Sequence, residues 1–413
     1  MTVRIAVLTL VPIATLCAQS PASPLTKDDA IRIALQYNQT LRGERNNIDQ
    51  SKASEVTAAL KPNPTFTSSL DAVPIFSPTT IRLGTNLYTQ SLFYTVERGG
   101  KRERRLDVAK DNTDIAAKTV TDNERQLKFN VAQAFINILL AKSVLDLANE
   151  DLNNFSQVVD LNRRRVTAGD LAEGDFLKIS LQKLQFQQDV AQAQLTLVQA
   201  RATLRQLLGY RNVPETFDVS GALQHKKELL VEDELERQAL ANRPDLLAAE
   251  SGTKLASDNV SLAVADRARD WTFGGDYTSQ LGINGVGASF SIELPVHDRN
   301  QGEIARTRAA TRQAAEVRDA AQIGVRTDVI NAYSGLKTAD ELTSLYESGY
   351  LDQATQSRDI TNYAYQRGAT AVLDLLDAER NYRATQLAYR QAVAAWMIAA
   401  EQLNQAVGTE VIR

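Results

Sequence analysis

The sequence has few of the residues from which metal sites, disulfides and reactive thiols are built. Its 413 residues include one cysteine, Cys17, and two histidines, His225 and His297. A histidine-based metal cluster is therefore excluded, and no disulfide is expected. Acidic and basic residues nearly balance at 50 and 46, so the charge does not favour nucleic acid as a partner. Beyond residue 20 we expect no apolar run long enough for a membrane-spanning helix.

Sequence motifs of enzymes are missing as well. There is no glycine-rich phosphate loop with a lysine, no Gly-x-Ser-x-Gly and no cysteine–histidine pair. The sharpest candidate for an acid and base is the pair Asp374 and Asp377, and no cleft-forming sequence surrounds it. We therefore expect a protein that is not an enzyme and has no cofactor.

Residues 1–18 are typical of a signal peptide. Arg4 provides the basic start, an apolar stretch runs from Ile5 to Leu16, and small residues follow. We expect cleavage after Ala18 and export from the cytoplasm. Cys17 leaves a lipidated N-terminus as an alternative, although Leu16 is larger than the residue that lipoprotein signals place before the cysteine.

The rest of the chain is a duplication with a period of about 200 residues. Gly169 recurs as Gly368, and the motif RQLLGY recurs as NQAVGT, each 199 residues later. We predict two repeats, residues 19–222 and 223–413. Each repeat has a helix, two short strands, a very long helix, a break that contains glycine, and a second long helix.

The long helices give the strongest signal. Residues 101–168 contain neither glycine nor proline, which predicts a continuous helix of about 100 Å. Apolar residues recur in it every seven positions, which indicates left-handed coiled-coil packing. One series is Val131, Ile138, Leu145, Leu152, Val159 and Val166, and the other is Ala134, Ala141, Ala148 and Phe155. The helices that open the repeats are expected at 26–60 and 228–268.

Four runs of about ten residues alternate between apolar and polar side chains, and this length crosses a bilayer when a strand is tilted. The runs are TFTSSLDA, TNLYTQSLFYTV, DWTFGGDYTS and GVGASFSIELP. A soluble sheet with one wet face predicts the same alternation. Because four strands cannot close a barrel and open edges are not tolerated in lipid, a membrane location requires several chains. Three chains would give twelve strands.

At this point the sequence resembles the outer-membrane efflux protein (TolC) family, over residues 26–408. LPVHDRNQGEIARTRA (294–309), with Asn300 and Gly302, is similar to the strand-to-helix junction of the family. VERGGKRERRLDVA (96–109), with Gly99 and Gly100, is its counterpart in the first repeat, and ALANRPDLLAAE resembles the Arg-Pro-Asp-Leu segment. The Gly-Gly-Lys-Arg form is closest to the branch that serves heavy-metal exporters of the resistance-nodulation-division type.

The resemblance implies a mainly α fold with a small β part. It implies a homotrimer in which a twelve-stranded β-barrel in the outer membrane continues as a helical barrel across the periplasm. The function would be that of a passive exit duct in a tripartite efflux system, with a periplasmic adaptor, an inner-membrane pump and outer-membrane lipid as partners. A coiled-coil spacer without a pore and the duct of a type I secretion system remain alternatives. The cargo, whether metal ion, drug or polypeptide, is left open.

The resemblance also assigns a gate at the helix ends furthest from the membrane. Gly169 and Gly368 would mark the helix–helix turns there. Asp374 and Asp377 match paired aspartates at the tunnel entrance, and in a trimer they would form two rings of carboxylates that favour cations.

Two further residues match a closing contact of the family, in which a tyrosine is held by an aspartate. Tyr365 would donate its hydroxyl to Asp175. Thr370 stands where the best-known member of the family has a basic residue that forms a second link. Arg367 or the run Arg163–Arg165 would have to replace that link. The segments 167–170 and 366–369 are expected to dock the adaptor.

Overall fold

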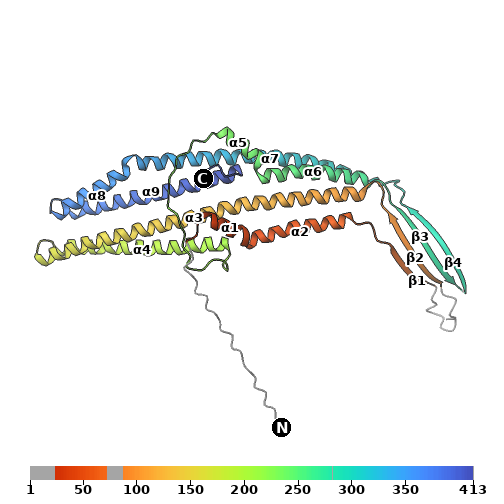
Figure 1. Cartoon of the computed structure of the whole chain (residues 1–413), viewed down its shortest axis with the longest axis horizontal. Coiled ribbons are helices and arrows are strands. Elements are labelled where there is room, and N and C mark those ends of the chain that lie inside the picture. Colours follow the sequence, from red (N-terminus) through yellow and green to blue (C-terminus); the bar gives the residue numbers. More distant parts are fainter. Residues whose placement is uncertain (1–23, 72–86, 281, 413) are drawn as a thin grey trace, which may run out of the picture.

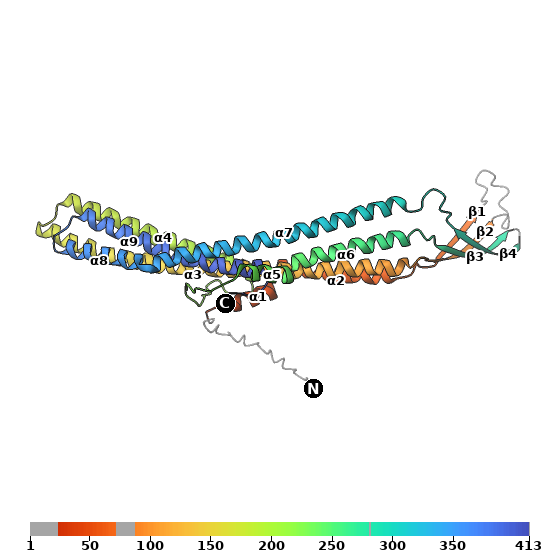
Figure 2. The ribbon, with the colours of Figure 1, turned by 90° about the horizontal axis from the view of Figure 1, so that it is seen from above.

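The computed structural model describes residues 24–71, 87–280 and 282–412. The molecule is elongated, with helices along most of its length and a small sheet at one end (Figures 1 and 2). The predicted class, mainly α with a small β part, is confirmed. The signal segment and Cys17 lie outside the described residues.

The two halves of the chain have the same order of elements. The first half contains α1 (Lys27–Tyr37), α2 (Gln39–Ala59), β1 (Thr65–Asp71), β2 (Leu87–Val96), α3 (Lys101–Ala168) and α4 (Glu173–Leu208). The second contains α5 (Glu232–Asn242), α6 (Pro244–Ala265), β3 (Trp271–Gln280), β4 (Ile283–Ile292), α7 (Gln301–Leu345), a π-helical turn (Tyr346–Tyr350), α8 (Leu351–Gln366) and α9 (Val372–Val407).

The helices that open the two halves are broken, whereas the sequence predicted one helix in each place. The breaks fall at Asn38 and Arg243, which are equivalent positions of the duplication. Asn38 donates its amide to the carbonyl of Leu207, at the end of α4, over 2.9 Å. Arg243 donates to the carbonyl of Ala406, at the end of α9, over 3.4 Å. Each break is thus fastened to the last turn of the second long helix of its own half.

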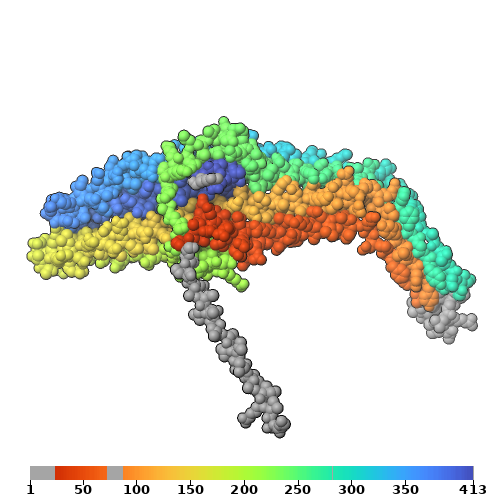
Figure 3. Space-filling view, viewed as in Figure 1, coloured from red at the N-terminus to blue at the C-terminus, as the bar shows by residue number. Residues whose placement is uncertain are grey.

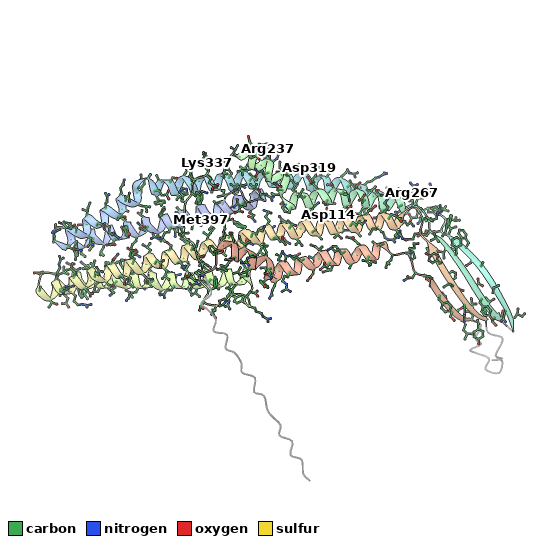
Figure 4. The ribbon with its side chains drawn as sticks, viewed as in Figure 1. Asp114, Arg237, Arg267, Asp319, Lys337 and Met397 are labelled. Atoms are coloured by element: carbon green, nitrogen blue, oxygen red, sulfur yellow. The ribbon has the colours of Figure 1, made fainter. Side chains whose placement is uncertain are left out.

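The long helix predicted for residues 101–168 is confirmed as α3. The first members of its apolar series pack against α1, α2 and α4 in one core, and residues of α5, α6, α7 and α9 form a second core. Met397 on α9 contacts both cores (Figure 4). One window of α3 is apolar enough to cross a membrane by length and composition, which the sequence analysis did not expect. More than half of that window is buried inside the chain, so we interpret it as a core segment.

The four strands form one antiparallel sheet in the order β1-β2-β3-β4. Residues directly opposite each other point to the same face, and the pairing brings Leu92 opposite Phe66, Tyr94 opposite Phe273, and Trp271 opposite Ile292. One face therefore carries most of the large apolar side chains. They are Phe66, Leu70, Tyr88, Leu92, Tyr94, Val96, Trp271, Phe273, Tyr277, Val286, Phe290 and Ile292. The other face carries mainly Thr, Ser, Gly and Asp, as predicted for a wall between lipid and water.

Candidate functional site

The two helix–helix turns lie at the end of the molecule opposite the sheet (Figure 2). Gly169 follows α3 and Gly368 follows α8, both with a positive φ, at 82° and 73°. Their amides donate to Val166 and Tyr365, which closes the ends of the helices. Behind the turns Phe155 stacks on Phe186 with ring centroids 4.5 Å apart. The start of α9 packs on this small core. The tip formed by α3 and α4 and the tip formed by α8 and α9 are thus joined within one chain.

Tyr365 of α8 is buried against α3 and forms its hydrogen bond with a residue other than the predicted one. Its hydroxyl donates to the amide oxygen of Asn162 on α3 over 2.6 Å. Asn162 is fully buried and donates in turn to the carbonyl of Val158. The carboxylate of Asp175, the predicted acceptor, pairs instead with Lys178 on the same turn of α4. Burial raises the pKa of Tyr365 above its usual value, so the phenol keeps its proton.

Asn162 was not among the predicted residues, although the sequence contains a signal for it. Asn162 lies seven residues after Phe155, at the next place in the second apolar series of α3. A polar residue at a core position of a coiled coil costs stability and commonly fixes the pairing of the helices. That position faces α8 directly, whereas Asp175 lies on the first turn of α4 with its carboxylate beside Lys178.

A second link between the same helices comes from Arg165. Its guanidinium donates to the carbonyls of Gln366, over 2.6 Å, and Tyr365, over 3.3 Å, at the end of α8. It also lies 5.3 Å from the centre of the Tyr365 ring. A cation at a helix C-terminus is favourable. Arg367, the other candidate for this link, stacks on Tyr363 of α8 at 3.6 Å.

The two aspartates of the predicted ring lie in the first turns of α9. Asp374 accepts hydrogen bonds from the Thr370 hydroxyl, over 2.7 Å, and from the amide of Ala371, so it caps the helix. Asp377 pairs with Arg380 at 3.2 Å, and both side chains are exposed. Thr370 therefore supports Asp374 instead of forming a link to another arm. The ring and its selectivity stay predictions for an assembly of several chains.

Between the tips and the middle of the molecule, a charged cluster joins three helices and was not predicted. Arg383 on α9 contacts Asp151 on α3, over 3.2 Å, and Asp189 on α4. Its guanidinium also lies 4.2 Å from the centre of the Phe186 ring. Burial raises the pKa of Asp151 to about 6 despite the nearby arginine. No local motif marks this cluster, because its members come from distant parts of the chain.

The strand-to-helix junctions lie where the sequence predicted them. Gly99 and Gly100 precede α3, and Asn300 precedes α7, all with a positive φ. A Cβ at Gly99 would come within 2.6 Å of the Cβ of Ala268, so the close approach of the chain requires glycine. Gly302 lies inside the first turn of α7 with open space around it, so packing within this chain does not require a glycine there. Figure 4 shows Arg267 beside these junctions.

Over the part of the chain that the structure describes, no three His, Cys, Asp or Glu side chains are placed to hold a metal ion. The candidate site is therefore a set of contacts between helical arms. It can hold the arms together or release them.

Comparison with known proteins agrees with this architecture. The family model described as outer membrane efflux protein matches residues 30–210 and 235–409. The cobalt-zinc-cadmium resistance protein CzcC of Cupriavidus metallidurans is 24% identical over 395 residues, which cover 94% of this chain and 91% of that protein. The cation efflux system protein CusC of Escherichia coli is 26% identical over 278 residues, 62% of this chain and 58% of that protein.

A crystal structure of CusC has the same fold, with a TM-score of 0.78 at 20% identity, covering 93% of this chain and 92% of that chain. The gate roles of the residues described above stay predictions, because these comparisons do not test single residues. The family model, in contrast, matches most of the sequence, in both halves. The chain therefore belongs to the outer membrane efflux protein family, whose members are channels and not enzymes.

Proposed function

We propose that this outer-membrane efflux channel works as a homotrimer that conducts metal cations and is closed at its helix tips. The four-stranded sheet is the main observation that favours an assembly of several chains. Over the described residues, β1 and β4 each pair with one neighbouring strand only. Unpaired backbone groups at such edges are not tolerated in lipid. Joining β1 of one chain to β4 of the next closes the wall, and three chains give the twelve strands of a barrel.

The helices extend from this barrel into the periplasm and end at the turns of Gly169 and Gly368. A periplasmic adaptor and an inner-membrane pump complete the pathway. The segments 167–170 and 366–369 form the exposed surface at that end and would receive the adaptor. A spacer without a pore would have no use for a sheet with one apolar face, and this disfavours that alternative.

The closed state would be held by the two links between α3 and α8. The Tyr365–Asn162 bond is buried, and breaking it leaves a polar group without a partner, which costs about 1–3 kcal/mol. The contacts of Arg165 with the end of α8 add a charged link. Opening the tip separates these helices, so both links oppose it.

The cargo is proposed from two features. In a trimer, Asp374 and Asp377 would place six carboxylates around the narrow end, where they favour cations. The relatives CzcC and CusC are named for cobalt, zinc and cadmium resistance and for cation efflux. Both features favour metal cations over drugs or polypeptides.

The test is single-channel conductance of the purified protein in a planar bilayer. We expect small cation-selective steps, and about tenfold more frequent opening after Tyr365→Phe, because about 1.4 kcal/mol corresponds to a factor of ten. Asp374→Asn together with Asp377→Asn should lower cation selectivity. Tyr363→Phe is the matched control, since Tyr363 is an exposed tyrosine on the same helix.

The outcomes separate the channel from the gate. Folded trimers that never conduct, even when Tyr365→Phe and Arg165→Ala are combined so that both links are removed, would rule out the pore. Steps that are unchanged by all of these substitutions would keep the pore and discard the assigned gate residues.

A further inference from the structure

The helical segment that leads to the second tip, from α7 to α8, is interrupted, whereas its counterpart α3 in the first half is continuous. A π-helical turn, Tyr346–Tyr350, separates α7 from α8. Gly349 in this turn has φ 131° and ψ −9°, a conformation that residues with a side chain rarely adopt. The nearest atom to a Cβ there would be 4.0 Å away, so the backbone requires glycine and the packing does not. Because α3 runs unbroken for 68 residues, a coiled coil of this length can form without a break.

The turn has room to move. A cavity of about 380 Å³ lies beside it, lined by residues of the turn, of α8 and of α9. Residues that line this cavity include Leu345, Tyr346, Tyr350, Gln353, Ala378 and Asn381. Interruptions of this kind are frequently found at functional sites. A break with a strained glycine and a cavity beside it is suited to bending.

The linker between α4 and α5, residues 209–231, contacts this turn through the side chain of His225. In Figures 1 and 3 the linker crosses the molecule from one arm to the other. Its His225 has a side chain that is only 6% exposed. The Nε2 atom lies 2.8 Å from a carboxylate oxygen of Asp340 on α7, and Nδ1 lies 3.0 Å from Glu347 in the turn. The imidazole thus links the last turns of α7 to the beginning of the π-helical turn.

The protonation of the ring decides how many of these contacts are hydrogen bonds. A neutral imidazole has one N–H, whereas imidazolium has two. Only the charged form can therefore donate a hydrogen bond to both carboxylates at the same time.

The surroundings of the ring fix it in place. The Trp396 ring of α9 meets it edge-on, with centroids 5.1 Å apart. Tyr389 of α9 donates to the same Glu347 carboxylate over 3.1 Å. On the linker itself, Lys227 lies 3.9 Å from Asp340 and is largely exposed. The titratable and charged side chains in contact with the ring or with its two carboxylates thus include Asp340, Glu347, Tyr389 and Lys227.

We propose that the turn Tyr346–Tyr350 is a hinge in the arm formed by α7 and α8, and that imidazolium at His225 clamps this hinge. The linker then acts as a strap: it restrains the arm when His225 is charged and releases it when the proton leaves. The inference rests on the proposed function in one respect, since it treats this arm as the part that opens the tip.

Hydrogen–deuterium exchange of the full-length protein in detergent tests the clamp without requiring conductance. After correction for the intrinsic effect of pH on exchange, amides of residues 346–350 should exchange about tenfold faster at about pH 8 than at about pH 5, the range in which histidine changes charge. His225→Gln should exchange quickly at both pH values. His297→Gln, a change at the other histidine, should behave as the wild type.

Two more variants keep the test decisive if His225→Gln folds poorly. Glu347→Gln removes one carboxylate and should also abolish the dependence on pH. Gly349→Ala places a side chain at a backbone conformation that residues other than glycine rarely adopt, and should change exchange in the turn. A dependence on pH that persists in His225→Gln or Glu347→Gln would overturn the clamp. Unchanged exchange in Gly349→Ala would overturn the hinge.

Conductance separates this inference from the proposed function. If the clamp is present, channels of Tyr365→Phe should open more often at about pH 8 than at about pH 5, and adding His225→Gln should remove the difference. Protein that shows the exchange pattern but never conducts would retain the clamp and refute the pore.

Discussion

Replacing Asp151 by asparagine should remove a stability cost that grows with pH. The carboxyl is buried beside Arg383, and its pKa rises from 3.8 to about 6. The folded state therefore holds this proton more tightly than the unfolded state does. The free energy of unfolding should fall as the pH rises from about 4 to above 6. A difference of about two pKa units corresponds to about 3 kcal/mol, and we expect about 2 kcal/mol after partial screening by solvent.

The measurement compares the unfolding of the wild type and Asp151→Asn from about pH 4 to about pH 8, by circular dichroism in detergent with denaturant. Near pH 4 the two proteins should have similar stability, since asparagine resembles a protonated aspartate. By about pH 8 the variant should be more stable by about 2 kcal/mol. Asp146→Asn, at an exposed position on the same helix, should follow the wild type. Parallel curves for the wild type and Asp151→Asn would refute the reasoning, and a less stable variant at high pH would show that pairing with Arg383 outweighs burial.

Three further substitutions test other contacts. Asn38→Ala removes the cap of α2 and the bond to Leu207, and should lower the free energy of unfolding by about 1–2 kcal/mol in denaturant titrations. Gly99→Ala places a Cβ against Ala268 and should reduce the yield of heat-resistant oligomer on gels, whereas Gly302→Ala should not. Arg165→Ala removes the cation at the end of α8 and should speed hydrogen exchange there several-fold; unchanged exchange would contradict the second link.

The regular elements could be predicted because their signals are local. The absence of glycine and proline from residues 101–168 defined α3, and the alternation in four runs located the strands. The breaks at Asn38 and Arg243 were missed. In both places a polar side chain reaches the last turn of a helix more than 160 residues away, and such a contact leaves no periodic trace.

The candidate site was predicted in part for the same reason. The positions of Tyr365, the two turn glycines and the aspartate pair follow from short motifs. The partner of Tyr365 does not, because it depends on which face of α3 meets α8 in three dimensions. The same holds for Arg383 and its two aspartates, and for His225, which looks unremarkable in the sequence and bridges two carboxylates in the fold.

The open edges of the sheet have a genetic consequence. In the proposed trimer each barrel needs the β1 edge and the β4 edge of every chain. A single edge that cannot pair therefore prevents the whole barrel from closing. A substitution that blocks one edge, such as a proline within β4, would therefore act as a dominant-negative allele. If equal amounts of normal and altered chains mix at random, roughly one trimer in eight contains only normal chains. A cell that carries both alleles should lose most of its efflux, even though it makes half of the normal amount of intact protein.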